Sequence, residues 1–112
     1  RMPIYVNTDD RIELTLEMTR DAEDALRQVL EDHEARLERV QVDLTHQGVV
    51  NGSDQIACAV AVHPKKGEVL ATEQTGTTVQ EAIQRAAAKL QRKLPAGFAR
   101  NDQPSLGQSP DA

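Results

Sequence analysis

The feature that most constrains the fold is a series of three short segments in which apolar residues alternate with polar or small ones. They cover residues 40–44, 56–62 and 69–74. Such alternation is typical of strands with one buried face. Two segments with helical periodicity lie on either side of this series. The sequence therefore predicts a sheet of consecutive strands, with one helix before it and one after it.

The connections between these strands favour hairpins. Residues 46–54 contain Asn51-Gly52, a pair that tolerates positive φ, and residues 64–67 contain the proline and glycine of a tight turn. Strands joined in this way pair in antiparallel fashion.

Two segments near the N-terminus compete for the first strand. Residues 11–18 alternate, with Ile12, Leu14, Leu16 and Met18 on one side, while residues 4–6 form a shorter apolar piece. A turn-prone stretch separates the two segments. The sequence leaves open which of them is the first strand.

The first helix is predicted over residues 20–37. Thr19 is a suitable N-cap, and Asp21 and Glu23 favour the positive end of the helix dipole.

The second helix begins with a capping box formed by Thr78 and Glu81. It is predicted to end at residues 95–97, where a proline and a glycine occur. Its apolar stripe consists of Val79, Ile83, Ala86, Leu90 and Leu94.

The resulting order is β-α-β-β-β-α, and it predicts an α+β two-layer sandwich. A mainly antiparallel four-stranded sheet would carry two helices on one face, as in double-stranded-RNA-binding domains. We expect one domain over residues 2–96 and a disordered tail over residues 97–112, because the tail has little apolar mass to offset its ordering entropy.

Composition limits both the core and the chemistry. With no tryptophan, one tyrosine and one phenylalanine in 112 residues, the core must be aliphatic. The lone Cys58 excludes an internal disulfide and a thiolate-rich metal site. No apolar run is long enough to span a bilayer, so we expect a cytoplasmic protein without a membrane partner. We also expect no catalytic residues, metal, cofactor or small-molecule substrate.

Charge is distributed unevenly along the chain. The formal net charge is -5, but residues 1–45 carry six basic and twelve acidic side chains, whereas residues 63–100 carry seven basic and three acidic ones. In the second helix, Arg85, Lys89, Arg92 and Lys93 fall within about one quadrant, at 100° per residue. The predicted turn adds Lys65 and Lys66. These six residues are the candidate site for nucleic-acid phosphates; the alternative is a solvated helix face with a favourable cationic C-terminus.

The last strand and helix resemble a known family. Residues 69–94, and especially Ala82-Ile83, Ala86 and the run Lys89-Leu90-Gln91-Arg92-Lys93-Leu94, are similar to the ribosome hibernation-promoting factor and ribosome-associated inhibitor family. This family is also known as the sigma-factor modulation proteins. Lys89 and Arg92 match its basic helix positions, while Lys65, Lys66, Arg85 and Lys93 are added by the geometry described above.

The resemblance implies a non-enzymatic inhibitor of translation from stress or stationary phase. Its partner would be the small ribosomal subunit, where it would occupy the mRNA and tRNA channel of idle ribosomes and contact rRNA phosphates. The length of the chain suggests a short form without the dimerisation domain of longer members. The oligomeric state stays open.

An alternative function is a protein-interaction module of the same fold, acting through the acidic first helix and the sheet surface. The alanines at 57, 59 and 61 would lie on the second face of the third strand and leave it open to a flat partner.

His33 is interpreted as a boundary residue of the first helix. His46 and His63 lie at opposite ends of a predicted hairpin and do not suit a shared metal. Cys58 is interpreted as a small buried hydrophobe.

Overall fold

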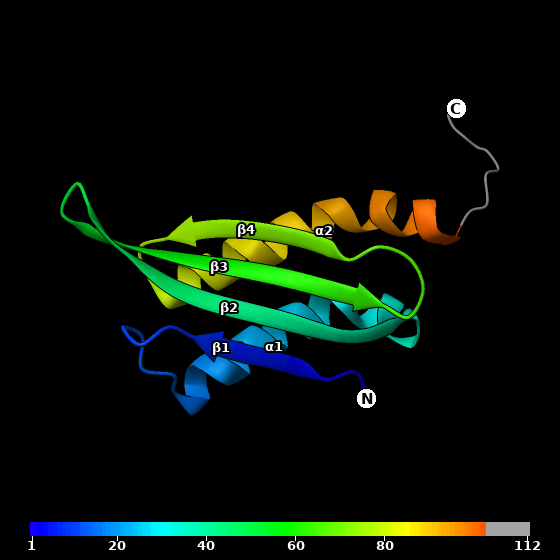
Figure 1. The fold of residues 1–112 in the computed structure, drawn as a ribbon, viewed down its shortest axis with the longest axis horizontal. Coiled ribbons are helices and arrows are strands. Elements are labelled where there is room, and N and C mark those ends of the chain that lie inside the picture. The colour runs from blue at the N-terminus through cyan, green and yellow to red at the C-terminus, as the bar shows by residue number, and fades with distance from the viewer. Residues whose placement is uncertain (103–112) are drawn as a thin grey trace.

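The computed structural model describes residues 1–102, and the side chains of residues 1–94. Figure 1 shows the predicted element order, β-α-β-β-β-α. The elements are β1 (Ile4–Thr8), α1 (Leu16–Leu30), the 3-10 helix η1 (Glu31–Arg36), β2 (Leu37–Val50), β3 (Ser53–Pro64), β4 (Leu70–Gly76) and α2 (Val79–Asp102).

The four strands form one sheet in the order β1-β2-β3-β4. β2, β3 and β4 pair in antiparallel fashion, as predicted, whereas β1 is parallel to β2, with Ile4 opposite Val40 and Thr8 opposite Leu44. The sheet is therefore mixed. The parallel pair arises because α1 forms the crossover between β1 and β2, and a crossover returns the chain in the same direction.

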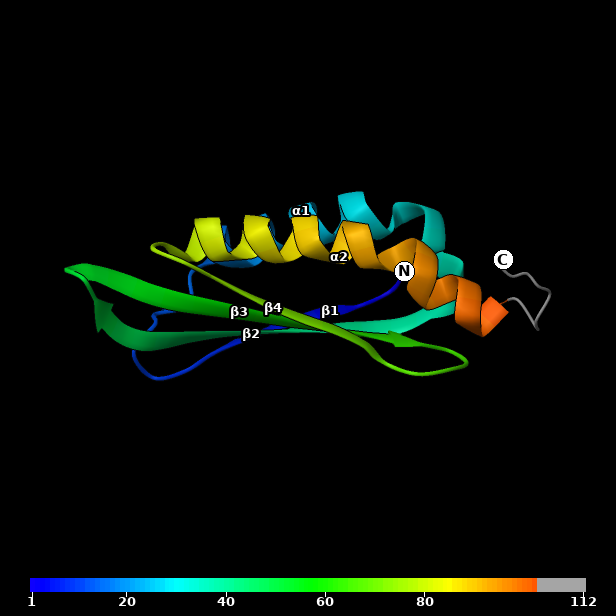
Figure 2. The same cartoon turned by 90° about the horizontal axis from the view of Figure 1, so that it is seen from above.

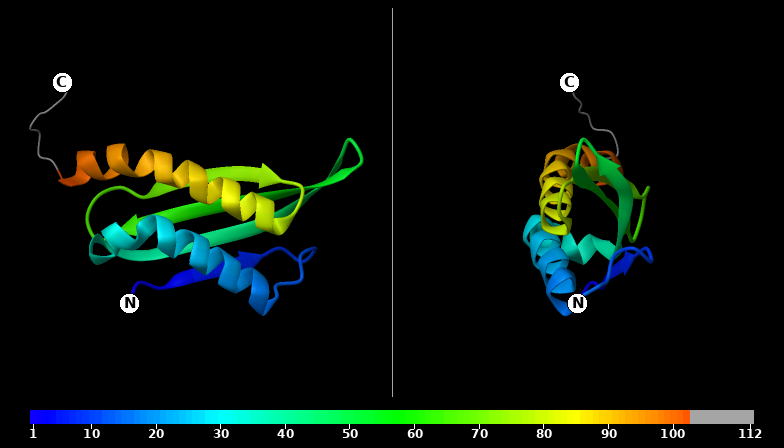
Figure 3. Two further views of the ribbon diagram at one scale, coloured as in Figure 1. Left: turned by 180° about the vertical axis from the view of Figure 1, so that it is seen from behind. Right: turned by 90° about the vertical axis from the view of Figure 1, so that its left-hand side faces the viewer.

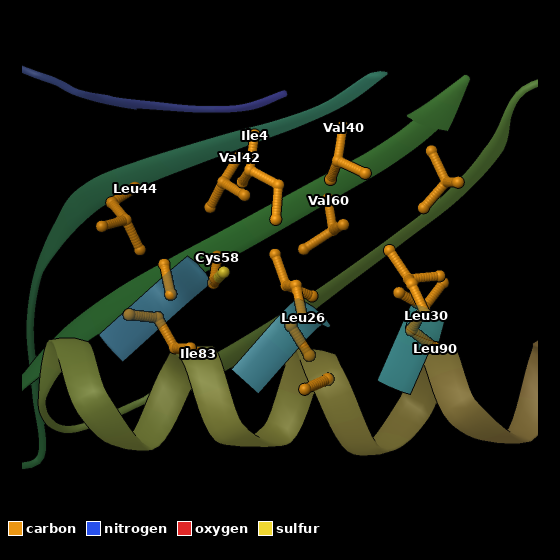
Figure 4. Close-up of a cluster of buried hydrophobic side chains, with 14 of the residues drawn as sticks. Ile4, Leu26, Leu30, Val40, Val42, Leu44, Cys58, Val60, Ile83 and Leu90 are labelled. Carbon is orange, nitrogen blue, oxygen red and sulfur yellow. The ribbon is translucent and has the colours of Figure 1, made fainter. Parts of the chain in front are cut away.

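Both helices cover the same face of the sheet, which confirms the predicted two-layer sandwich (Figure 2). Side chains from β1, β2 and β3 point toward the helices and pack against Leu26, Leu30 and Leu90 (Figure 4). Among the described residues the buried cluster holds no aromatic side chain, and Tyr5 is 51% exposed. The prediction of an aliphatic core is confirmed.

The first strand is the shorter N-terminal piece, and residues 11–18 do not form a strand. Thr15, rather than the predicted Thr19, caps the first helix, and its Oγ1 accepts a hydrogen bond from the Met18 backbone N at 3.1 Å. Leu14 and Leu16 are exposed despite the alternation. This local capping chemistry outweighs the period-two pattern, because a side-chain oxygen satisfies a helix N–H that has no partner within the helix.

The first helix also ends earlier than predicted. It stops at Leu30, and the chain continues as η1 before Leu37, the predicted last helical residue, begins β2. Leu37 is buried and belongs to the core.

The β2–β3 hairpin is longer than predicted. The strands continue to Val50 and from Ser53, so that only Asn51 and Gly52 form the turn, with φ of 53° and 80°. Positive φ at both turn residues gives the twist of a two-residue hairpin. Residues 46–54, which were predicted as a loop, lie largely in these two strands. Figure 3 shows the resulting two-stranded ribbon extending past the other strands.

α2 does not end at residues 95–97 but continues to Asp102. Proline keeps a helical φ and removes one backbone donor, so a helix can continue through it with a bend. Figure 2 shows the axis of α2 bending toward its orange end. Residues 103–112 of the predicted tail lie outside the described residues, and the division of the chain at residue 96 stays a prediction.

Candidate nucleic-acid interface

The start of α2 is held by a network of three residues. The Glu81 backbone N donates to Thr78 Oγ1 at 3.0 Å, as the capping box predicts. The Glu81 carboxylate accepts hydrogen bonds from the backbone N and the hydroxyl of Thr77, at 2.6 and 3.0 Å. The Thr77 backbone bond in particular holds the pKa of Glu81 below its ordinary value. Glu81 is therefore an anion fixed at the first turn of the helix.

The apolar stripe of α2 determines where its charges lie. Ala82, Ile83, Ala86, Leu90 and Leu94 are buried against the sheet and α1. The basic flank is thereby turned toward β4, the outermost strand on this side of the sheet. Figure 3 shows the two helices side by side in front of the sheet, with α2 on the β4 side.

Two cations of the flank contact the backbone of β4. Arg85 donates from Nη1 to the Thr75 carbonyl at 3.1 Å, and Lys93 donates from Nζ to the Ala71 carbonyl at 2.6 Å. Arg85 also forms an ion pair with Glu81, with 3.3 Å between Nη2 and Oε2. Arg85 is thus the member of the flank whose charge a neighbouring carboxylate balances.

The other four predicted site residues have no such partners. Among residues 1–94, no hydrogen bond or ion pair engages the side chains of Lys89, Arg92, Lys65 or Lys66. Arg92, Lys65 and Lys66 are exposed, and Lys89 is half-buried.

The loop that carries Lys65 and Lys66 lies near the second half of the α2 flank. It connects β3 to β4, and Lys93 contacts Ala71 at the start of β4, next to this loop. Figure 1 shows the β3–β4 loop on the same side of the molecule as the orange end of α2. The fold therefore places Lys93 beside the start of β4, where this loop ends, and Arg85 lies two helical turns away along α2.

Sequence reasoning missed a basic residue next to the β3–β4 loop. Arg36, in η1, accepts a hydrogen bond from the Lys65 backbone N through its carbonyl at 2.9 Å, which joins η1 to the β3–β4 loop. Its guanidinium lies 2.9 Å from His33 Nδ1. Arg36 belongs to the acidic first half of the chain, and no local spacing signals its proximity to Lys65.

The sheet face away from the helices carries a shallow depression of about 320 Å³. Ala59, Ala61 and Ala71 line it, with Asp43 and Glu73 at its two sides. Ala57 was predicted to belong to the same open surface, but it is 1% exposed. The open face is therefore acidic where it is hollowed, which disfavours phosphate there.

The histidines do not form a site. His46 pairs with Ile56 and His63 with Arg39, so they lie far apart along the hairpin. His46 Nε2 contacts Asp54 Oδ1 at 3.1 Å, and His63 Nε2 contacts Gln41 Oε1 at 3.0 Å. His33 lies in η1 rather than in an α-helix, and partial burial lowers its pKa.

Cys58 is a buried core residue, as predicted. Burial raises the pKa of its thiol to about 12, so the thiolate form is absent at neutral pH. Within residues 1–94, no three histidine, cysteine or acidic side chains gather into a possible metal site. None of the helices in this part of the chain is long and apolar enough to cross a membrane.

The fold and the flank define a small α+β domain in which two helices cover one face of a mixed sheet and a row of cations follows the outer strand. A sequence model of one family matches residues 8–95. The chain belongs to this family, which is described as sigma 54 modulation protein / S30EA ribosomal protein.

Two solved structures have the same fold. A ribosomal subunit interface protein from Coxiella burnetii is 11% identical, with a TM-score of 0.71 over 88% of this chain and 99% of that one. The N-terminal domain of Protein Y from Thermus thermophilus is 20% identical, with a TM-score of 0.66 over 82% of this chain and 94% of that one. No curated protein sequence matches this chain significantly.

Proposed function

We propose that this protein binds the small ribosomal subunit and inhibits translation in idle ribosomes, through contacts to rRNA phosphates. The observation that carries the proposal is the family match, which spans residues 8–95 and includes the whole basic flank of α2. The names of the two similar structures, a ribosomal subunit interface protein and Protein Y, agree with this assignment. The mRNA and tRNA channel is the proposed place of binding.

The distribution of charge supports a docking surface on an anionic molecule. Four cations, Lys65, Lys66, Lys89 and Arg92, are not neutralised by a carboxylate among residues 1–94, and Lys93 contacts only a carbonyl. Phosphate binding by such groups releases condensed counterions, and this contribution to affinity increases with the number of phosphates that the cations contact. Arg85 is proposed as a weaker contributor because Glu81 balances its charge.

The experiment is co-sedimentation with purified small subunits at low and moderate salt. The variant Lys89→Glu with Arg92→Glu should bind at least about tenfold more weakly, because two phosphate contacts are replaced by repulsion. Its melting temperature should change little, since Arg92 is exposed, Lys89 is partly exposed, and neither side chain forms an ion pair among residues 1–94. Absence of wild-type binding at both salt concentrations would refute the proposed function.

A matched control separates position from net charge. Arg11→Glu with Arg20→Glu introduces the same charge change at exposed positions before and within α1. We expect this control to bind within about twofold of the wild type. If both double variants lose the same affinity, the assignment of the site to α2 is wrong.

A further inference from the structure

The contacts between α2 and β4 place the helix in register with the outer edge of the strand. Arg85 and Lys93 are eight residues apart on the helix, which is a rise of about 12 Å. Their acceptors, the carbonyls of Thr75 and Ala71, are four residues apart on the strand, about 13 Å. Because these lengths agree, Lys89 lies level with the Glu73 backbone, midway between the two contacts.

The same contacts show which backbone groups of β4 point outward. In an antiparallel pair, a residue that directs its carbonyl away from the partner strand directs its N–H the same way. The register is regular, with Ala71, Glu73 and Thr75 opposite Ala61, Ala59 and Ala57. The N–H groups of Ala71, Glu73 and Thr75 therefore point to the outer edge, where β4 has no neighbouring strand among residues 1–102.

This edge offers donors but few acceptors. Lys93 and Arg85 already occupy the carbonyls of Ala71 and Thr75. An added peptide strand needs those carbonyls to accept its own N–H groups, so the occupied edge disfavours strand addition. A phosphodiester backbone needs only donors and positive charge, and the edge supplies both.

We infer that the outer edge of β4 and the adjoining flank of α2 form a track for an RNA phosphodiester backbone. Phosphate oxygens would accept from the N–H groups of Ala71, Glu73 and Thr75, which are about 7 Å apart, with the Lys89 ammonium beside them. The inference rests on the proposed function and names the backbone donors that would act there together with the cations. The carboxylate of Glu73, whose side chain lies on the open sheet face with Ala59, opposes the binding.

Ala71→Pro tests the track without a change of charge. Proline removes the outward N–H, keeps the carbonyl that Lys93 contacts, and is tolerated on an edge strand because the lost donor takes no part in the ladder. Ala71→Ser keeps the N–H and is the matched control. With oligouridylate as the probe, fluorescence anisotropy should show about threefold to tenfold weaker binding for the proline variant than for the serine variant.

A second measurement uses the unmodified protein, so that a folding defect of the proline variant does not decide the result. Amide NMR signals of Ala71, Glu73 and Thr75 should shift on titration with oligouridylate, and those of the inward-facing Thr72 and Gln74 should shift less. If the amide signals do not shift on titration with oligouridylate, but Lys89→Glu with Arg92→Glu weakens binding to small subunits, the track is refuted and the proposed function stands. If the wild-type protein binds neither oligouridylate nor small subunits, the proposed function itself fails.

Discussion

Gly76, the last residue of β4, lies directly against the backbone of Ala82 in the first turn of α2. A Cβ at position 76 would lie 2.8 Å from the Ala82 backbone N and 3.0 Å from the Cβ of Glu81. Neither the Ala82 backbone N nor the Glu81 Cβ can move away without a shift of the helix backbone. The close approach fixes where α2 begins relative to β4, and with it the positions of Arg85, Lys89 and Lys93 along the strand.

Gly76→Ala should therefore destabilise the protein by about 1 to 3 kcal/mol, the usual cost of overpacking. For a domain of this size, the melting temperature should fall by roughly 4–8 °C per kcal/mol. Thermal unfolding followed by circular dichroism measures the change. Thr75→Ala, at an exposed neighbouring position, is the control and should change stability by less than about 0.5 kcal/mol. Equal stability of the wild type and Gly76→Ala would show that the strand and helix do not meet this closely.

Thr72 is 7% exposed, and its Oγ1 has no hydrogen-bond partner among the described residues. An unsatisfied buried hydroxyl carries a desolvation penalty that an apolar group of the same shape does not. Thr72→Val should raise the free energy of unfolding by about 1 kcal/mol. Urea denaturation measures it, with Thr75→Val on the exposed side of the same strand as the control. A loss of stability in Thr72→Val would mean that the hydroxyl is hydrogen-bonded after all.

Asp9 ties the β1–α1 connection to β2. Its carboxylate accepts hydrogen bonds from the backbone N of His46 at 2.9 Å and of Arg11 at 3.0 Å, and its own N donates to the Leu44 carbonyl at 3.1 Å. The bond from His46 is the main cause that lowers the pKa of Asp9 from its usual 3.8. Because the folded pKa is below the unfolded one, this stabilisation is complete above the unfolded pKa and is lost as the pH falls through the folded value.

Asp9→Asn should accordingly lower the melting temperature at pH 7, and the difference from the wild type should shrink as the pH falls below about 3.8. Melting curves at a series of pH values between 7 and 2.5 measure this convergence. Asp10→Asn removes a neighbouring exposed carboxylate and should leave the melting temperature nearly unchanged throughout. A difference for Asp9→Asn that stays constant over this range would contradict the role of the ionised carboxylate.

Much of the second half of the chain was predictable because its signals are local. The Asn51-Gly52 turn, the Thr78 cap and the apolar stripe of α2 each depend on residues within a few positions of one another, and the structure contains all three. The N-terminal region was not predictable in this way. There, alternating residues 11–18 and the cap at Thr15 give conflicting signals, and the pairing of β1 with β2 decides which segment becomes a strand.

The candidate site shows the same division. Helical spacing was enough to place Arg85, Lys89, Arg92 and Lys93 on one flank, but it carries no information on what each cation contacts. That Lys93 and Arg85 occupy the carbonyls of β4, and that Arg36 adjoins Lys65, depends on residues brought together from separate elements.

The sequence by itself determined the types of most elements, their order, the aliphatic core and the clustering of basic residues near the C-terminal end of the fold. These properties follow from periodicity, capping and composition, which act between neighbours in the chain. Only the tertiary structure decided the parallel β1–β2 pair, the continuation of α2 past Pro95 and which groups each basic side chain of α2 contacts. Their physical reason is contact between groups distant in sequence, whose energies depend on the packing of the whole domain.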